Sequence, residues 1–435
     1  MTAHFAIIGS GPSGMYAADA LLEGIPDCHI DVYDRLPAPF GLIRYGVAPD
    51  HYKTKNTARQ FARTLDLPNV RFFGNVEIGR DVTLDELKML YDGVILAIGA
   101  YNDRPLGIPG EDLAGVYGAC AFVGWYNGHP DYRDLNPLLD KDAVAVVGVG
   151  NVALDVCRVL AKTVAEMDDS DIAEHALAAI QKAPLKNLYM FGRRGPIEAG
   201  FTPKELGELR ELERAVAFVD SKQLPDTVTG EFEGREKGVK EKNLTIFKEL
   251  ATHQPGTKAI DMKIEFYAAP KEILGTTRVE GIRMERTKVE NGKAISTGET
   301  FDVPCGAVVK AIGYFSTAPA GVPMNGNGTI ANVDGWVVDN LWVVGWSKRG
   351  PSGTIPTNGP ESREVAQRVI AEYQSAPGTE KSGGDAVALL LKSRNVRSVD
   401  YPGWKKIATA EVARATGGHP QEKFTRIDEM LAVLN

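Results

Sequence analysis

Short apolar runs alternate with helical patterns along this chain. Residues 5–8 form the first apolar run, and a glycine-rich turn then leads into a helical pattern that reaches Leu22. A second run, residues 30–34, ends in an acid, Asp34. Continuous apolar runs of this length are typical of parallel strands that are buried on both faces. The alternation of such strands with helices predicts an α/β fold.

The turn after the first strand has the glycine spacing of a dinucleotide-binding loop. Gly9 permits the tight turn, Gly11 lets the backbone approach a pyrophosphate, and Gly14 allows close packing of the following helix. The free N–H groups at the start of that helix favour phosphates. Asp34, 20 positions after Gly14, is placed to accept hydrogen bonds from a ribose 2'-OH. These features predict a first nucleotide site, with an ordinary tight turn as the alternative.

A second motif of the same kind opens at Ala143. The apolar run Ala143–Val147 precedes a Gly-x-Gly-x-x-Ala turn at residues 148–153. The strand that closes this unit, Asn187–Phe191, is followed by Arg193 and Arg194 instead of an acid. An acid would repel a 2'-phosphate, whereas guanidinium groups donate to it in a forked geometry. The second site is therefore predicted to prefer NADP(H) over NAD(H), with a solvated arginine pair as the alternative.

One repeated pattern indicates how the chain is divided into domains. Residues 94–99 and 308–313 are similar apolar runs, and both end in Ala-Ile-Gly. This repetition indicates that the chain crosses from one domain to the other and back, with a crossing near Asn102. The predicted domains are residues 1–102 with 330–435, and residues 103–329.

Other stretches give a coarser prediction. Helices are expected at residues 53–65, 165–182, 198–213 and 361–373 and in the tail, and further strands at residues 70–76 and 341–345. Residues 216–301 are polar and turn-rich, and residues 375–384 are expected to form a flexible surface segment. The stretch 216–301 contains a local basic cluster, which has two interpretations: a solvated face or a docking site for a partner. The cluster consists of Arg235, Lys237, Lys240, Lys242 and Lys248.

Composition excludes several classes of protein. The formal charge of −8 argues against a nucleic-acid partner. The longest nearly apolar run, residues 93–101, is about half of the roughly 18 residues that a membrane span requires. We expect no signal or transit peptide, because residues 1–4 contain no basic segment and lead directly into the first strand. We therefore expect a reduced, cytoplasmic protein without a Cys-ligated metal, because no C-x-x-C pair occurs among Cys28, Cys120, Cys157 and Cys305.

Two dinucleotide motifs, one with a ribose acid and one with an arginine pair, describe a chain that holds FAD and NADPH together. In these motifs, the sequence resembles the adrenodoxin reductase family of ferredoxin–NADP reductases, in the glutathione reductase-like superfamily. The loop at residues 40–51 and the Gly-Trp-x-Lys-Arg-Gly-Pro run at residues 345–351 are the most specific matches. The resemblance implies two Rossmann-like dinucleotide-binding domains, with the FAD domain built from both ends of the chain.

The resemblance also implies site residues, and no metal among them. FAD is expected to contact Gly9, Gly11, Ser13, Gly14, Asp34, Leu42, Val76, Trp346, Gly353, Thr354 and Ile355. NADP(H) is expected to contact Gly150, Asn151, Val152, Ala153, Arg193, Arg194, Glu205 and Gly353. His51 and Glu208 are expected to tune the flavin or exchange protons near it, with a structural hydrogen bond as the alternative for His51.

The implied activity is that of a ferredoxin–NADP+ reductase, which passes electrons from NADPH through FAD, one at a time, to a ferredoxin. A [2Fe-2S] ferredoxin is the expected partner, no nucleic acid or membrane is expected to bind, and a monomer is plausible. The family often has a basic residue where Ala268 and Ala269 stand, and arginines where His419 and Gln421 stand. These departures leave the cofactors unchanged and bear on the iron–sulfur partner.

Four alternatives remain open at this stage. A pyridine nucleotide–disulfide reductase shares the two-nucleotide plan, but it needs a redox cysteine pair. A flavin monooxygenase acting on a small molecule would oxygenate its substrate with O2. A reductase subunit of the glutamate synthase kind usually carries an extra cysteine-rich segment, which this chain lacks. A non-catalytic FAD- and NADPH-binding sensor would hold both cofactors without turnover.

Overall fold

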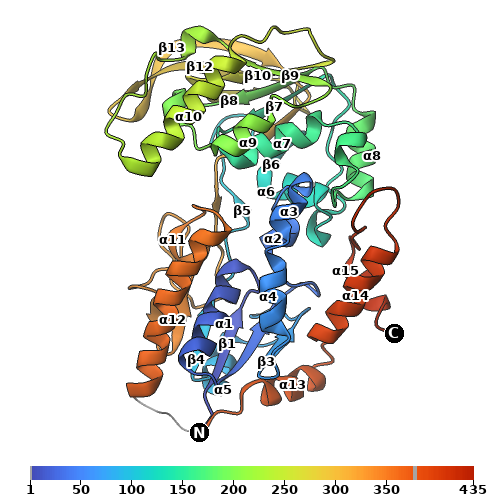
Figure 1. Ribbon diagram of the computed structural model, residues 1–435, viewed down its shortest axis with the longest axis vertical. Coiled ribbons are helices and arrows are strands. Elements are labelled where there is room, and N and C mark those ends of the chain that lie inside the picture. The colour runs from blue at the N-terminus through green and yellow to red at the C-terminus, as the bar shows by residue number, and fades with distance from the viewer. Residues whose placement is uncertain (1, 376–379) are drawn as a thin grey trace. The chain divides into compact units, whose positions relative to one another are not determined.

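The computed structural model describes residues 2–375 and 380–435, and these form two compact units (Figure 1). Unit 1 comprises Met1–Val47, His51–Asn102 and Tyr314–Asn435. Unit 2 comprises Ala48–Asp50 and Asp103–Gly313. Each unit contains one six-stranded sheet, so the predicted α/β fold with two dinucleotide-binding folds is confirmed.

The sheet of unit 1 has the strand order β16-β17-β4-β1-β2-β3. All neighbours are parallel except β16 and β17. The central strands are buried on both faces, which explains their continuous apolar runs. The strands are β1 His4–Ile8, β2 His29–Tyr33, β3 Val70–Phe73, β4 Gly93–Leu96, β16 Trp336–Val338 and β17 Leu341–Val343.

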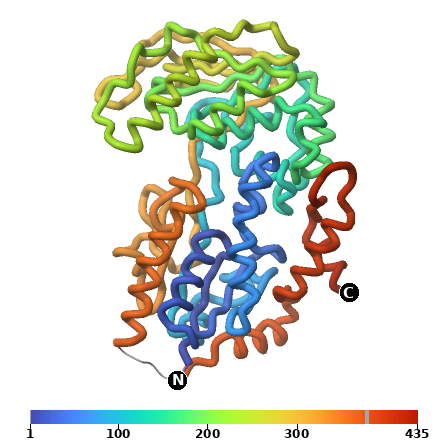
Figure 2. The backbone as a smooth tube through the Cα atoms, in the orientation of Figure 1, coloured from blue at the N-terminus to red at the C-terminus, as the bar shows by residue number. Residues whose placement is uncertain are grey.

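Helices from both ends of the chain cover this sheet. Figure 2 shows α1, in blue, beside the orange α12, and residues of both helices lie in one core with residues of α4 and α14. A second core lies around α5 and α13. The helices are α1 Pro12–Gly24, α2 Leu42–Tyr45, α3 Tyr52–Lys55, α4 Ala58–Leu65, α5 Leu84–Leu90, α11 Trp346–Arg349, α12 Asn358–Ser375, α13 Gly383–Ser393, α14 Tyr401–Ala413 and α15 Ile427–Ala432.

Unit 2 repeats this plan with a wholly parallel sheet. Its strand order is β6-β14-β7-β8-β10-β9. The strands are β6 Val116–Gly118, β7 Ala143–Val147, β8 Asn187–Phe191, β9 Ala215–Val219, β10 Ile260–Glu265 and β14 Ala307–Lys310. The helices are α6 Ala119–Tyr126, α7 Asn151–Ala161, α8 Glu174–Lys182, α9 Pro203–Glu208 and α10 Gly234–Leu250.

An antiparallel sheet of three strands completes unit 2, and it lies in the stretch that the sequence described only as polar and turn-rich. Its strands are β11 Ala268–Leu274, β12 Gly281–Glu290 and β13 Lys293–Pro304. The residues of β13 are mostly exposed, so the strand carries no continuous apolar run. Antiparallel strands with one solvated face give a weaker pattern than buried parallel strands. Two short strands, β5 Asn102–Asp103 and β15 Tyr314–Phe315, pair with each other.

The second domain crossing differs from the predicted one. Residues 314–329 were assigned to the second domain, but in the structure they belong to unit 1. The hydroxyl of Ser316 donates to the carbonyl of Gly99 (2.5 Å), and Met324 forms a bridge with Ile330. These contacts within unit 1 begin directly after Gly313, so the crossing comes earlier than position 329.

Several predicted elements are shorter than expected. Residues 53–65 form two helices, which are broken after Lys55, where the ammonium group of Lys55 turns to the carbonyl of Arg44 (3.3 Å). Only α9 forms within residues 198–213, because Thr202 caps a helix that begins at Pro203. Strand β3 ends at Phe73 because Gly74 pairs with the tail at Val399. The predicted segment 375–384 lies partly outside the described residues.

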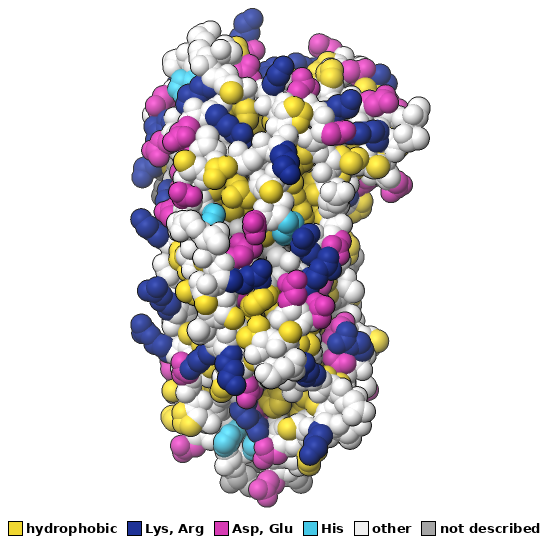
Figure 3. All heavy atoms as spheres, turned by 90° about the vertical axis from the view of Figure 1, so that its right-hand side faces the viewer, with side chains coloured by type: hydrophobic (Ala, Val, Ile, Leu, Met, Phe, Trp, Pro, Cys, Tyr) yellow, Lys and Arg dark blue, Asp and Glu magenta, His cyan; other side chains and the backbone are white. Residues whose placement is uncertain are grey.

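The surface shows no segregation of charge on the face in Figure 3, where basic and acidic side chains intermingle. Within residues 2–375 and 380–435, no helix is long and apolar enough to cross a bilayer. The same residues contain no group of three or more His, Cys, Asp or Glu side chains arranged to hold a metal ion.

Candidate functional site

The first glycine loop lies at the carboxyl end of β1 in unit 1. A Cβ atom on Gly9, which has a φ of 109°, would lie 2.4 Å from the carbonyl oxygen of Ala97. A Cβ atom on Gly14 would lie 2.1 Å from the carbonyl oxygen of Gly9. At Gly11, by contrast, an added Cβ would meet nothing within 4 Å. Gly9 and Gly14 are thus required by packing, and Gly11 faces the open space that a pyrophosphate needs.

The second glycine loop repeats this geometry in unit 2. A Cβ atom on Gly148, at a φ of 140°, would lie 2.2 Å from the carbonyl oxygen of Ala311. Gly150, like Gly11, has nothing within 4 Å, and Ala153 is fully buried. The repeated Ala-Ile-Gly runs follow the strands next to β1 and β7, and Ala97 and Ala311 are the residues against which the two first glycines pack. The repeated Ala-Ile-Gly run therefore packs against the first glycine of each nucleotide loop.

Asp34 is held beside the first glycine loop. Its Oδ2 atom accepts hydrogen bonds from the backbone N–H (3.2 Å) and the hydroxyl of Ser10, and its Oδ1 atom accepts one from the N–H of Leu36 (3.0 Å). Burial raises the pKa of Asp34, although these hydrogen bonds favour the ionised form. Oδ1, which accepts only one of these hydrogen bonds, can accept another, so a ribose hydroxyl fits this group.

The chain after Asp34 folds back over the glycine loop. The N–H of Phe40 donates to the hydroxyl of Ser10 (3.1 Å). A Cβ atom on Gly41, at a φ of 48°, would lie 3.2 Å from the Cα atom of Gly11. Leu42 then begins α2. Val76, which is buried, donates its N–H to the carbonyl of Asp34 (3.0 Å). The predicted FAD residues in the first 76 positions thus meet around one loop.

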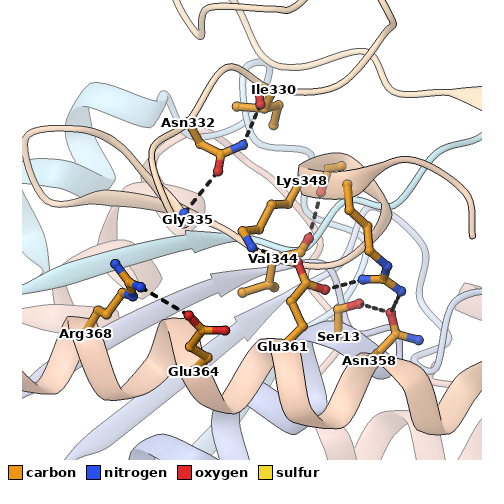
Figure 4. A network of polar contacts seen from close by, with 12 residues as sticks. Ser13, Ile330, Asn332, Gly335, Val344, Lys348, Asn358, Glu361, Glu364 and Arg368 are labelled. Carbon is orange, nitrogen blue, oxygen red and sulfur yellow. Dashed lines mark hydrogen bonds and ion pairs between the residues drawn. The ribbon is translucent and has the colours of Figure 1, made fainter. Parts of the chain in front are cut away.

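The start of α12 joins this loop through Asn358 (Figure 4). Its Oδ1 atom accepts hydrogen bonds from the hydroxyl of Ser13 (2.9 Å) and from the guanidinium of Arg349 (2.8 Å). Its amide nitrogen donates to the carbonyls of Thr354 and Ile355, both at 3.1 Å. Asn358 therefore fixes residues from both ends of the chain, and the sequence analysis missed it because no local pattern singles it out.

The Gly-Trp-x-Lys-Arg-Gly-Pro run lies directly before this helix. Lys348 (3.3 Å) and Arg349 both pair with Glu361 of α12, as Figure 4 shows for the labelled Lys348 and Glu361. These two cations thus have partners within unit 1 that position the run. Trp346 donates its ring N–H to the carbonyl of Ser352 (3.0 Å) and stacks on Tyr314 at 6.3 Å between ring centroids.

Gly353 and Thr354 continue this part of unit 1. Gly353 has a φ of 83°, and an added Cβ would lie 2.7 Å from the side chain of Thr357. The N–H of Thr354 donates to the hydroxyl of Thr357 (3.0 Å), and Ile355 begins a short 3-10 turn. The predicted residues 353–355 therefore form one tight turn before α12.

In unit 2, Thr202 brings two predicted NADP(H) residues together. Its N–H donates to the side-chain oxygen of Asn151 (2.9 Å), and its hydroxyl donates to the carboxylate of Glu205 (3.0 Å). Asn151, Val152 and Ala153 form the first turn of α7, directly after Gly150. The start of α7 and the start of α9 are therefore adjacent.

The two arginines after β8 are not equivalent. Arg193 is exposed, whereas Arg194 is half-buried and its guanidinium donates to the carbonyl of Gly292 (3.4 Å). Both guanidinium groups lie directly after the strand that neighbours β7, the position from which a nucleotide ribose is read in this fold.

Comparisons with known proteins identify the family. A family model for pyridine nucleotide-disulphide oxidoreductases matches residues 3–183. Human mitochondrial NADPH:adrenodoxin oxidoreductase is 38% identical, and the match covers 100% of this chain and 92% of that protein. NADPH-ferredoxin reductase FprA of Mycobacterium tuberculosis is also 38% identical, over 99% and 98% of the two chains. This chain belongs to the adrenodoxin reductase family.

A solved structure leads to the same family. M. tuberculosis FprA in complex with NADPH matches with a TM-score of 0.95 at 37% identity, over 100% of this chain and 99% of that chain. The resemblance inferred from the glycine motifs and the loop at residues 40–51 is thus confirmed for adrenodoxin reductase family membership. The roles of individual residues stay predictions.

The cysteines distinguish this member of the adrenodoxin reductase family from disulfide reductases that use a cysteine pair. The structure describes all four cysteines, and none of them forms a disulfide. Burial raises the pKa of Cys28, Cys157 and Cys305 to about 12. Such thiols stay protonated at neutral pH and are poor nucleophiles. The match to the pyridine nucleotide-disulphide oxidoreductase model therefore reflects the shared nucleotide fold.

The two residues predicted to act near the flavin lie in different units. His51 ends the 3-10 turn Pro49–His51 and is half-buried in unit 1. Glu208 is the last residue of α9 in unit 2, and its carboxylate lies 3.6 Å from the guanidinium of Arg158.

Arg158 is a buried residue that the sequence analysis missed. Its guanidinium pairs with Asp50 through Nε (2.7 Å) and Nη2 (3.0 Å), and it lies 2.8 Å from Asp155. Lys162 also pairs with Asp50 (2.8 Å). Burial alone would raise the pKa of Asp50, but Arg158 and Lys162 outweigh it and hold the pKa below its ordinary value. The available signal was a single arginine in the otherwise apolar run 156–161.

Proposed function

We propose that this chain is an NADPH-dependent flavoprotein reductase that passes electrons from NADPH through FAD to a ferredoxin-type iron–sulfur protein. The observation that carries the proposal is a pair of open glycine cradles, at Gly11 and Gly150, in one chain. An acid follows the first cradle and an arginine pair follows the second. The names of the relatives, NADPH:adrenodoxin oxidoreductase and NADPH-ferredoxin reductase, support the same activity.

Unit 1 supplies the residues that would hold FAD. Gly11 leaves room for the pyrophosphate, Gly9 and Gly14 shape the loop around it, and Asp34 accepts a hydrogen bond from the ribose. The other residues proposed to contact FAD lie in several elements of unit 1. They are Ser13, Leu42, Val76, Trp346, Gly353, Thr354 and Ile355. When bound, FAD couples a two-electron donor to one-electron acceptors, and the chain supplies binding and orientation.

Unit 2 supplies the residues that would hold NADP(H). The start of α7, Gly150 to Ala153, offers backbone N–H groups to the pyrophosphate. Arg193 and Arg194 bind the 2'-phosphate, and Glu205 is held beside Asn151 through Thr202. Gly353 is also proposed to contact NADP(H).

His51 and Glu208 are proposed to modulate the flavin or to exchange protons near it. Neither is required as a nucleophile, because the cofactors carry the chemistry. The separate variants His51→Gln and Glu208→Gln should alter the rate at which NADPH reduces the flavin. Unchanged rates in both variants would remove the assignment.

The electron acceptor is proposed to be a [2Fe-2S] ferredoxin, which makes the enzyme a ferredoxin–NADP+ reductase.

The basic cluster of residues 235–248 lies on α10, where Lys240 and Lys248 donate to the carbonyls of Ile197 and Asp226, both at 2.6 Å. A cytoplasmic location and a monomeric state stay predictions.

Stopped-flow oxidation of NADPH with a panel of purified [2Fe-2S] and [4Fe-4S] proteins tests this function. We expect fast reduction of at least one ferredoxin, with [2Fe-2S] proteins favoured. Consumption of O2 coupled to an oxygenated product, without reduction of any ferredoxin, would instead indicate a monooxygenase. A yellow protein whose flavin NADPH fails to bleach would indicate a non-catalytic sensor.

A further inference from the structure

The turn that carries the arginine pair is held through three successive carbonyl groups. The carbonyl of Gly192 accepts the N–H of Ala268 (3.0 Å). The carbonyl of Arg193 accepts the hydroxyl of Thr287 (2.8 Å). The carbonyl of Arg194 accepts the N–H of Tyr267 (3.1 Å). These three hydrogen bonds to its carbonyl groups therefore hold the main chain of the turn in place.

The donors come from the antiparallel sheet of unit 2 and from the residue that leads into it. Tyr267 lies between β10 and β11, Ala268 begins β11, and Thr287 lies within β12. Thr287 is 8% exposed, and its own N–H donates to the carbonyl of Tyr267 (2.9 Å). The pairing of β12 with β13 shifts register between Glu285 and Thr287. Such bulges re-aim side chains, and here the neighbouring threonine reaches the carbonyl of Arg193.

Two further contacts tighten this arrangement. Tyr267 has a φ of 56°, which is uncommon for a residue with a side chain, and the hydrogen bonds on both sides of it hold that conformation. A Cβ atom on Gly195 would lie 2.4 Å from the hydroxyl oxygen of Tyr267, so the turn packs directly on this ring.

The donors of the turn are left for a ligand. Among the described residues, none accepts a hydrogen bond from the backbone N–H of Arg193 or Arg194. Successive free N–H groups beside two guanidinium groups suit a doubly charged oxyanion. The carbonyl that Thr287 holds shares its peptide unit with the N–H of Arg194, and the carbonyl that Ala268 holds shares its unit with the N–H of Arg193.

We propose that Thr287 is a positioning residue for the 2'-phosphate of NADP(H). It does not touch the phosphate, but it fixes the carbonyl of Arg193 and thereby orients the N–H of Arg194, which lies in the same planar peptide unit. This inference rests on the proposed preference for NADPH. The antiparallel sheet, which lies outside the dinucleotide-binding fold itself, thus supports the nucleotide specificity that the arginine pair provides.

Calorimetric titration of the flavin-loaded protein with two fragments tests the proposal. Adenosine 2',5'-bisphosphate carries the 2'-phosphate, and 5'-AMP lacks it. Thr287→Val should weaken the bisphosphate about tenfold, the equivalent of one lost hydrogen bond, and should leave 5'-AMP unchanged. Thr287→Ser, which keeps the hydroxyl, should bind both fragments as the natural protein does.

A matched control lies on the next strand of the same sheet. The exposed hydroxyl of Thr297 donates to the carbonyl of Arg286 (2.9 Å) and makes no hydrogen bond to the turn itself, so Thr297→Val should leave both affinities unchanged. If Thr287→Val does not fold, Thr287→Cys keeps the size and replaces the hydroxyl with a weak donor. The same selective loss is expected for Thr287→Cys.

The outcomes separate this inference from the proposed function. Equal losses for both fragments, or no loss for either, would overturn the role of Thr287 while the bisphosphate still binds more tightly to the natural protein. If the natural protein binds the two fragments equally, and replacing Arg193 and Arg194 changes neither affinity, the NADPH preference itself fails and the inference falls with it.

Discussion

The guanidinium of Arg44 donates to the carboxylate of Glu411 over 2.6 Å, and both side chains are buried. The Arg44 guanidinium also lies 4.9 Å from the ring centres of both Tyr45 and Trp404. Glu411 accepts a further hydrogen bond from the N–H of Phe424 (2.9 Å). Helix α14 therefore holds α2, which directly follows the loop over the first glycine motif.

Glu411→Ala should destabilise unit 1 and weaken FAD binding, because it leaves a buried guanidinium without its partner. Breaking a buried pair in this way costs about 3–5 kcal/mol. Calorimetric unfolding and the fluorescence of released FAD measure the two effects. Lys405 of α14 pairs with Asp66 at the surface, so Lys405→Met should change stability by less than about 1 kcal/mol. Similar effects of both substitutions would contradict a special role for Arg44.

The pair of Asp50 with Arg158 should make the stability of unit 2 depend on pH. Because the pKa of Asp50 is below its ordinary value in the folded chain, its contribution is complete above about pH 4 and is lost as the pH falls through the lower, folded pKa. Asp50→Asn should cost about 3–5 kcal/mol at pH 7, and the gap to the natural protein should narrow below about pH 4. Urea unfolding at several pH values measures this difference in the free energy of unfolding. A difference that does not change with pH would contradict the prediction.

Alanine substitutions should distinguish the glycines of the first loop. Gly9→Ala meets the carbonyl of Ala97 and has an unfavourable φ, so it should lower the melting temperature of the apoprotein. Gly11→Ala has room in the protein and should leave the apoprotein stable, yet it should prevent FAD from binding. The flavin-to-protein ratio after reconstitution is the second measurement. A stable Gly11→Ala variant that still binds FAD would place the pyrophosphate elsewhere.

Replacing Arg193 and Arg194 by glutamine should weaken NADPH much more than NADH. Each charged hydrogen bond to the 2'-phosphate contributes about 1.5–3 kcal/mol, and NADH lacks that phosphate. We expect a loss of about 100-fold or more in kcat/KM for NADPH, with little change for NADH. Equal losses for the two coenzymes would show that the arginines do not bind the phosphate.

The sequence predicted best where local pattern and tertiary role coincide. Ala143–Val147, a continuous apolar run, and Asn187–Phe191, the strand expected to close the second nucleotide unit, have the predicted bounds in the structure. The helix expected at residues 198–213 is shorter in the structure, because Thr202 caps it and it begins only at Pro203. Local periodicity alone does not locate such a helix start.

Partners that are distant in sequence were beyond prediction. Arg44 and Glu411 are separated by 367 positions, and Asp50 and Arg158 by 108. Nothing near either residue in sequence indicates its partner. The three-stranded sheet that holds the arginine turn was missed for a related reason, since its solvated strands show no continuous apolar run. The glycine loops themselves were readable because their spacing alone carries the mechanism.

Anaerobic titration of the purified protein with NADPH, followed by its visible absorbance, tests the central claim most directly. We predict a yellow protein whose flavin absorbance is bleached by about one equivalent of NADPH and far less readily by NADH. A colourless protein that cannot be reconstituted with FAD, or a flavin that NADPH leaves oxidised, would contradict the account.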